Sequence, residues 1–332
     1  MPRPRALLPA VCAVAALVSG CGDGEERDPG SGSSPAPSAA AFPKAEGRGL
    51  ERLLLEEGGA PSENGPFLAP AGAVNQAGES RYTFVLLDIK RDFVTDVDAI
   101  ALYVADGPEG KVSGPFPAAR ESLRTQARFR SKTTANDEAA PPFIYRAKVK
   151  FPKRGDSFVA AIIKRGEKFT TVQPEPAKIQ SFKGLPPVGE QAPRIHTPTI
   201  DDVANVKEID TRDPPTTQHA VDLHDVLGAK PVVLLFATPL LCTSRVCGPV
   251  ADITEQLKQT TYRDADVEFI HVEIFNDNDP NKGYRKEVRS YGLPSEPWVF
   301  VIDRKGVVRS AFEGGFGIDE LSRAIGRVAS PK

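Results

Sequence analysis

Two cysteines in the C-terminal half of the chain have the spacing and the surroundings of a redox pair. Cys242 and Cys247 are separated by four residues and follow the continuous apolar run 232–237, which predicts a buried strand. Apolar residues recur at helical spacing over 249–259, so Cys247 should stand where a helix begins. A helix N-terminus has free N–H groups and about half a positive charge, which favour a thiolate over a thiol. Because the thiolate is the reactive form of cysteine, this position favours thiol–disulfide exchange.

The residues around the pair fit the same chemistry. Gly248 allows close approach of the backbone, Pro249 suits an early helical position, and Arg245 adds a nearby cation. The intervening loop is short enough for Cys242 and Cys247 to form an intramolecular disulfide. A purely structural disulfide is the alternative interpretation, but a bridge across so short a loop would stabilise the fold little.

Three segments of the C-terminal half resemble the thioredoxin superfamily. They are Cys247-Gly248-Pro249, Gly189-Glu190-Gln191-Ala192-Pro193, and Glu296-Pro297-Trp298 with the following apolar run and Asp303-Arg304-Lys305-Gly306. The resemblance covers about residues 186–330 and implies a thioredoxin-like α/β fold. It further implies that Pro297 is a cis-proline that presents its neighbouring backbone to a substrate peptide. Trp298 is expected either to contact substrate beside the redox site or to pack in the core.

The sequence departs from the thioredoxin pattern at the cysteines. Thioredoxins have Cys-x-x-Cys, whereas this chain has Cys-x4-Cys, and Val250 stands at the second cysteine position. The copper chaperones of the Sco type are also thioredoxin-like, and they have Cys-x3-Cys together with a histidine shortly before the last central strand. The corresponding position here is near Ser295, and no histidine lies within 20 residues of it. Copper binding is therefore the second interpretation, after thiol–disulfide exchange.

The histidines of this chain predict no metal site. His271 lies in the predicted strand 267–275, where a packed or a surface position is expected rather than a ligand position. The other three histidines lie before the predicted strand 232–237 and have no ligand spacing to the cysteine pair; they are His196, His219 and His224. The only methionine is Met1, so the mature chain lacks the other soft copper ligand. No cofactor is predicted.

The N-terminus has the features of a bacterial lipoprotein signal peptide. Arg3 and Arg5 precede the apolar stretch 6–18, which is too short to span a bilayer. Val18-Ser19-Gly20-Cys21 resembles the lipobox, after which Cys21 would become the lipidated first residue, carrying palmitate-type acyl chains. A plain signal peptide with an incidental Cys21 is the alternative. Both interpretations place the mature protein outside the cytoplasm, where disulfides persist.

Composition then divides the mature chain into three parts. Residues 21–75 are rich in Gly, Ser, Pro and Ala and predict a flexible linker. Residues 76–178 predict an immunoglobulin-like β-sandwich and residues 184–332 the thioredoxin-like domain. The predicted strands of the sandwich are 81–89, 99–105, 142–151 and 157–165.

The overall composition limits the classes of function. Hydrophobic residues make up 40% and charged residues 26%, as in ordinary globular proteins, and a net charge of −2 gives no general attraction to nucleic acid. We therefore expect a membrane-anchored, extracytoplasmic thiol–disulfide oxidoreductase. Its partners would be extracytoplasmic protein thiols or disulfides, and the membrane through the lipid anchor. A Sco-like copper-binding factor and a redox-inert interaction module are the rival interpretations.

Overall fold

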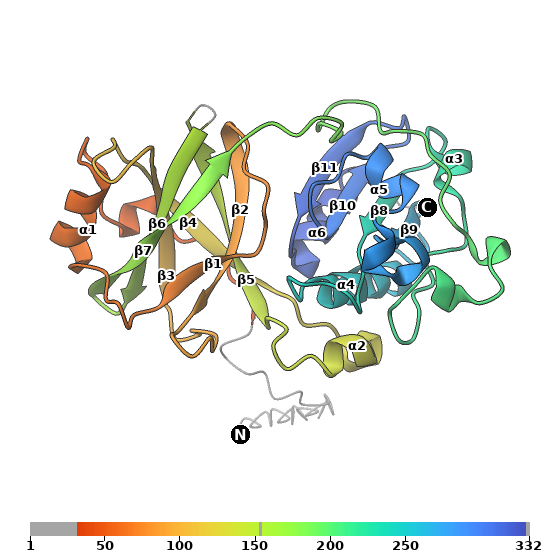
Figure 1. Ribbon diagram of the computed structural model, residues 1–332, viewed down its shortest axis with the longest axis horizontal. Coiled ribbons are helices and arrows are strands. Elements are labelled where there is room, and N and C mark those ends of the chain that lie inside the picture. Colours follow the sequence, from red (N-terminus) through yellow and green to blue (C-terminus); the bar gives the residue numbers. More distant parts are fainter. Residues whose placement is uncertain (1–31, 153–154, 330–332) are drawn as a thin grey trace, which may run out of the picture.

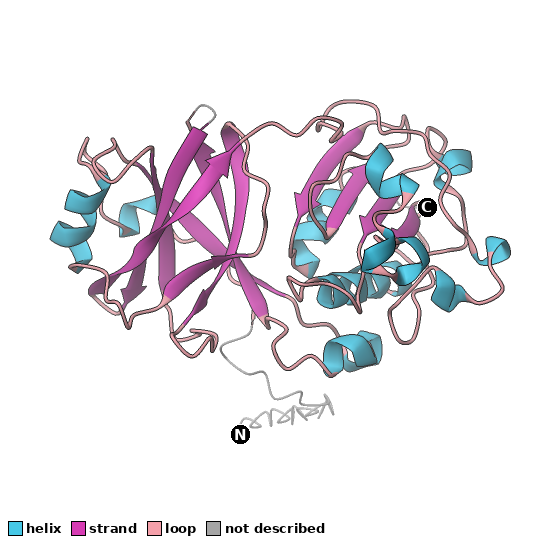
Figure 2. Ribbon diagram, viewed as in Figure 1, coloured by secondary structure: helices cyan, strands magenta, loops and turns pink. Residues whose placement is uncertain are grey.

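The computed structural model describes residues 32–152 and 155–329, which form an all-β domain and a mixed α/β domain (Figures 1 and 2). The predicted signal peptide and Cys21 lie outside the described residues. Within the described ranges, no helix is both long enough and apolar enough to cross a bilayer.

The β domain is one antiparallel sheet that curls into a near-barrel (Figure 1). Its strand order is β1-β2-β5-β4-β3-β6-β7, and the two edge strands, β1 and β7, lie against each other. The bounds are β1 Phe67–Pro70, β2 Gly78–Leu87, β3 Ala99–Ala105, β4 Ser113–Ser122, β5 Phe143–Phe151, β6 Gly155–Arg165 and β7 Lys168–Ile179. The core inside the barrel consists of aromatic and aliphatic side chains from these strands, including Phe84, Leu102 and Tyr145.

Strand β4 makes the sheet continuous, so the domain is not the two-sheet, immunoglobulin-like sandwich that the sequence predicts. The first half of β4 pairs with β3, as in Leu102↔Phe116, and its second half pairs with β5, as in Ala118↔Ala147. One strand thereby joins the β1-β2-β5 group to the β3-β6-β7 group. Periodicity shows which face of a strand is buried but not which strand is its neighbour, and this is why the strand order differs.

Part of the predicted linker 21–75 is packed against the β domain. Helix α1 (Leu50–Gly58) buries Leu50, Leu53 and Leu54, whose spacing places them on one helical face. This face covers the outside of β3 and β6 in a separate apolar cluster. Strand β1 also belongs to this segment, as do the short 3-10 helix η1 (Ala39–Ala41) and its flanking turns. The folded β domain therefore includes these elements as well as residues after 76.

The α/β domain is built on a four-stranded sheet with the order β11-β10-β8-β9. Strands β8 and β9 are parallel, and β10 runs antiparallel to both β8 and β11. The strands are β8 Val232–Phe236, β9 Glu268–Val272, β10 Trp298–Ile302 and β11 Val308–Glu313. The α-helices are α3 Leu223–Val226, α4 Cys247–Gln259, α5 Lys286–Ser290 and α6 Ile318–Ile325, with 3-10 turns η3 Ile200–Asp202, η4 Val206–Glu208, η5 Asn276–Asn278 and η6 Pro280–Lys282.

Both faces of this sheet are covered, which explains the continuous apolar sequence of β8. Val233 and Leu235 face α4 and α6, whereas Val232, Leu234 and Phe236 belong to the opposite apolar cluster with α3 and α5. Burying β8 on both faces fixes it in the middle of the domain. The end of β8 is therefore a rigid point from which the cysteine loop departs.

The two domains share a hydrophobic core and a set of charged contacts. Val85, Leu123 and Ile144 of the β domain belong to the same cluster as Val246 and Phe316 of the α/β domain. Beside this cluster, the side chain of Arg81 donates to both oxygens of the Glu320 carboxylate, at 2.9 and 2.7 Å, and to the backbone carbonyls of Glu313 and Gly315. Because the buried cluster crosses the boundary, the β domain forms one wall of the region around the cysteines.

Candidate functional site

Cys242 and Cys247 form a disulfide between the end of β8 and the beginning of α4. Their Cα atoms are 5.9 Å apart, and Cys247 is the first residue of α4. Strand β8 ends at Phe236, so residues 237–246 form the loop that carries Cys242. The structure thus confirms the predicted strand, the predicted helix and the pairing of the two cysteines.

The two sulfur-bearing residues differ in exposure. Cys247 is completely buried in the core that the two domains share, whereas Cys242 is half-buried and lies against the edge of that core. The Sγ atom of Cys242 lies 3.2 Å from the hydroxyl oxygen of Ser244, which is exposed. Only Cys242 is therefore placed to meet a partner molecule, a difference that the sequence alone does not show.

The N-terminus of α4 favours a thiolate at Cys247, in opposition to the apolar burial of that residue, which favours the neutral thiol. The first turn of α4 contains no acidic residue, and the N-cap residue Val246 has no side-chain hydrogen bond to the helix. The positive end of the helix dipole therefore acts on Cys247 without a competing carboxylate. Gly248 is required here, because a Cβ atom at this position would lie 2.8 Å from Oγ1 of Thr134 in the β domain.

A loop of the β domain lines the approach to Cys242. Helix α2 (Lys132–Ala135) and the residues after it face an open pocket of about 490 Å³, whose opposite side includes Leu241, Cys242 and Pro249. Asp137 from this loop forms an ion pair with Arg245, at 2.5 Å between Oδ1 and Nη1. Any molecule that reaches Cys242 through this pocket must therefore contact both domains.

The other two predicted site residues lie at the entrance to β10. The peptide bond between Glu296 and Pro297 is cis, and Pro297 directly precedes Trp298, which pairs with Phe236 at the end of β8. The chain therefore enters β10 beside the point where β8 leads into the cysteine loop. Trp298 is 4% exposed, stacks on Phe300 with a centroid distance of 5.6 Å, and donates to Ser295. Its position is that of a core side chain.

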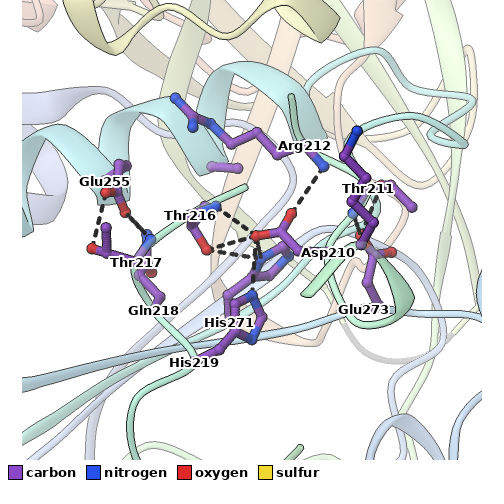
Figure 3. A network of polar contacts seen from close by, with 12 residues as sticks. Asp210, Thr211, Arg212, Thr216, Thr217, Gln218, His219, Glu255, His271 and Glu273 are labelled. Atoms are coloured by element: carbon purple, nitrogen blue, oxygen red, sulfur yellow. Dashed lines mark hydrogen bonds and ion pairs between the residues drawn. The ribbon is translucent and has the colours of Figure 1, made fainter. Parts of the chain in front are cut away.

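A buried polar network lies against the backbone that precedes Cys242 (Figure 3). His271 of β9 contacts the carbonyl of Ala237 through Nε2 at 3.1 Å. The N–H of Leu240 donates to Oγ1 of Thr211, and this threonine in turn donates to the Glu273 carboxylate at 2.7 Å. Ala237 and Leu240 of the cysteine loop are thereby held by hydrogen bonds to side chains of this network.

The centre of this network is the Asp210 carboxylate. Its Oδ2 atom is 3.0 Å from Nε2 of His219 and 3.4 Å from Nδ1 of His271, and it accepts hydrogen bonds from the backbone N–H and the hydroxyl of Thr216. Next to this network, Arg212 forms a buried ion pair with Asp252 of α4 at 2.7 Å. Arg212 also donates to the carbonyl of Phe129, so the pair connects α4 with the β domain.

Burial and neighbouring charges shift the pKa values of these groups in different directions. Burial alone would raise the pKa of Asp210, but the charge of His271 and the hydrogen bond from His219 lower it overall. Burial lowers the pKa of His219. Burial acts in the same direction on His271, but the charge of Asp210, its hydrogen bond and the charge of Glu273 together outweigh burial and raise the pKa. Burial also raises the pKa of Glu273.

The sequence did not predict this cluster of histidines. His219 and Asp210 come from the irregular segment before α3, where no periodicity connects them with His271. The one available signal was the sequence of β9 and the residues after it, in which His271 and Glu273 interrupt an apolar run. Among the described residues, Asp210, His219 and His271 are the one group whose ligand atoms lie close enough together to share a metal ion, and it contains neither cysteine.

Comparison with solved structures gives similarities of limited extent. No protein-family profile matches the chain, and no curated protein matches it. A solved structure from Chlorobium tepidum, assigned as a thiol:disulfide interchange protein DsbE, is similar to 43% of this chain and to 98% of its own length. The identity is 19% and the TM-score is 0.31. The fold class is therefore described from the chain itself: an antiparallel near-barrel joined to a mixed α/β domain with a disulfide at a helix N-terminus.

Proposed function

We propose that this protein is a thiol–disulfide oxidoreductase that works outside the cytoplasm. The observation that carries the proposal is the unequal exposure of the two cysteines: Cys242, in the loop before α4, is accessible, and Cys247, the first residue of α4, is buried. This arrangement provides one sulfur to attack a partner and a second to resolve the product. The order of β8, α4, β9, β10 and β11 supports the thioredoxin-like fold that the sequence resemblance implies.

In the reduced protein, the thiolate of Cys242 attacks one sulfur of a substrate disulfide. A mixed disulfide forms, and the first substrate thiolate leaves and takes up a proton. The Cys247 thiolate, favoured by the helix N-terminus, then attacks Sγ of Cys242. The Cys242–Cys247 disulfide is restored and the second substrate thiol is released, so that two electrons pass from the protein to the substrate. The same steps in reverse oxidise a substrate dithiol.

The N-terminal sequence supports the proposed location. The lipobox-like segment before Cys21 supports a lipid anchor on the extracytoplasmic face of a bacterial membrane. A multiply acylated cysteine anchors a protein stably, because each buried CH₂ group contributes about 0.8 kcal/mol. The folded domains would then meet protein thiols and disulfides in a compartment where disulfides persist.

Trapping of the mixed disulfide tests the mechanism. Cys247→Ser retains the half-buried, accessible thiol of Cys242 and should accumulate covalent, reductant-sensitive adducts with a disulfide substrate such as insulin. Cys242→Ser should accumulate far fewer adducts, because its remaining thiol is buried. Both variants should lose catalytic turnover, and both should lose little stability because the disulfide closes a short loop. Full insulin-reducing activity in either single variant would exclude the dithiol mechanism. A large loss of stability, together with an inactive wild type, would favour a structural disulfide.

A further inference from the structure

Three side chains from two distant segments of the sequence meet in the interior of the α/β domain. Asp210 and His219 come from the segment before α3, and His271 comes from β9 (Figure 3). One ligand atom from each lies within 4.8 Å of the other two, and all three residues are buried. The cluster is separate from the proposed chemistry of the cysteines.

The hydrogen bond that Nε2 of His271 makes determines whether Nδ1, the other ring nitrogen, can act as a ligand. Nε2 lies 3.1 Å from the Ala237 carbonyl oxygen, which can only accept, so Nε2 carries a hydrogen. In a neutral ring Nδ1 then has a free lone pair, and this lone pair faces Oδ2 of Asp210 at 3.4 Å. The buried carboxylate needs a positive charge at this position, and either a proton on Nδ1 or a metal ion bound to its lone pair supplies that charge. A backbone carbonyl that orients the outer nitrogen is also the usual support for a metal-binding histidine.

Hydrogen bonds within the protein leave two polar atoms near this cluster without a partner. They are Oε1 of Gln218 and Nδ1 of His219, the ring nitrogen that does not face Asp210. The His219 side chain is 1% exposed, so bulk water does not satisfy its nitrogen. Buried polar atoms without partners are rare in native proteins and often accompany an ion or ordered water.

The donor types and their separations fit a small divalent ion. Zinc binds nitrogen and oxygen at about 2.0–2.2 Å, which places the ligand atoms of a tetrahedral site about 3.3 Å from one another. Here Oδ2 of Asp210 lies 3.0 Å from Nε2 of His219 and 3.4 Å from Nδ1 of His271. Oγ1 of Thr216 lies 3.5 Å from the same Nδ1 and offers a fourth oxygen.

We propose that Asp210, His219 and His271 form a binding site for a divalent transition-metal ion, with zinc as the best match. Two imidazoles and one carboxylate suit zinc, whereas calcium and magnesium prefer oxygen ligands alone and copper(I) prefers sulfur. The ion joins the segment that contains Asp210 and His219 to β9, and through the Ala237 carbonyl to the residues before Cys242. It is a structural ion that holds the base of the cysteine loop.

The first experiment measures metal in the full-length protein. The purified wild type is unfolded in denaturant that contains a chelator. Denaturant and chelator are then removed, and the protein is refolded with Zn²⁺, with Co²⁺ or with no metal. We expect one equivalent of zinc by elemental mass spectrometry and a higher melting temperature with zinc, because an ion that binds only the folded state stabilises it. Cobalt should give the intense visible absorption of a tetrahedral site. Less than 0.1 equivalent of either metal, with an unchanged melting temperature, would overturn the proposal.

Histidine variants locate the metal. His219→Gln should lower zinc affinity at least tenfold. The matched control is His196→Gln with His224→Gln, which changes two partly exposed histidines that stack on each other outside the cluster. The control should bind zinc with the affinity of the wild type. An equal loss of zinc affinity in His219→Gln and in the control would overturn the assignment. If His219→Gln does not fold, the comparison of refolded wild-type samples with and without zinc decides the question by itself.

A second control separates this site from the cysteines, whose reduced thiols also bind zinc. The double variant Cys242→Ser and Cys247→Ser should retain one equivalent of zinc. Loss of the metal in this double variant would show that the thiols are the ligands and would contradict the proposal. Retention of metal together with loss of disulfide exchange would show that the two sites are independent.

Discussion

Asp137 of the β domain forms an ion pair with Arg245 in the loop between the two cysteines, at 2.5 Å. Arg245 has a φ of 58°, a left-handed conformation that is costly for residues other than glycine. The disulfide loop is thus held from outside by a residue of the other domain. Since the Arg245 side chain is 53% exposed, the ion pair itself should contribute less than about 1 kcal/mol.

The backbone conformation at this position can be tested with a matched pair of variants. Arg245→Gly and Arg245→Ala both lose the contact with Asp137, but only glycine adopts the left-handed conformation without steric cost. In the oxidised protein, the glycine variant should have a free energy of unfolding about 1 kcal/mol larger than that of the alanine variant. Denaturant unfolding measures the difference, and an alanine variant of equal or greater stability would refute this account of the loop.

Close packing between the domains at the start of α4 should make Gly248 intolerant of a side chain. Gly248→Ala would place a Cβ atom 2.8 Å from Oγ1 of Thr134, and overpacking of this kind costs about 1–3 kcal/mol. Thermal unfolding should show the loss. Thr134→Ala in the same chain removes the opposing oxygen and should restore part of the stability. If the double variant is as unstable as the sum of the two single changes, the clash is not the cause.

The carboxyl group of Glu313 should make stability depend on pH. Burial raises the pKa of this group, although it accepts hydrogen bonds from the Ala73 N–H and the Ser295 hydroxyl. A raised pKa in the folded state means that the folded protein binds more protons than the unfolded chain between the two pKa values. Stability should therefore fall as the pH rises from the unfolded pKa through the folded pKa.

Glu313→Gln isolates this effect, because glutamine keeps an acceptor oxygen without the charge. The melting temperature of the wild type minus that of Glu313→Gln should become more negative from pH 4 to pH 7. The exposed Glu167, changed in the same way, serves as the control for the loss of one carboxylate at the surface. A difference that is constant or that rises with pH for Glu313→Gln would contradict the raised pKa.

The proposed lipid anchor depends on Cys21. Cys21→Ser should move the protein from the membrane fraction to the soluble fraction or the medium, because the sulfur that carries the acyl chains is lost. Cell fractionation and metabolic labelling with palmitate measure the change. Membrane retention of the variant at the wild-type level would exclude the lipoprotein interpretation.

The α/β domain could be predicted closely because its signals are local. The apolar run 232–237 and the helical spacing after Cys247 correspond to β8 and α4, and the pairing of the cysteines follows from their short separation. Strand β10 begins at Trp298, as the apolar run after Pro297 predicts. Each of these signals involves residues close together in the chain.

The features that the sequence did not predict depend on distant contacts. Strands β4 and β7 each contain two prolines, which conceal a strand pattern, and the closure of the sheet depends on which strands are neighbours. Helix α1 lies in a segment whose composition is that of a linker, yet its leucines find a partner on β3 and β6. Likewise, Asp210 and His219 meet His271 only in the folded protein, and no regular spacing in the sequence indicates that contact.

The midpoint potential of the Cys242–Cys247 disulfide tests the proposed oxidoreductase function most directly. The protein is equilibrated with defined ratios of reduced and oxidised dithiothreitol, its free thiols are alkylated, and the reduced fraction is measured by intact mass. A disulfide that exchanges with substrates should have a potential above about −300 mV, because it must be reduced and reoxidised in each cycle. A potential well below about −300 mV would identify a structural disulfide and contradict the proposed function.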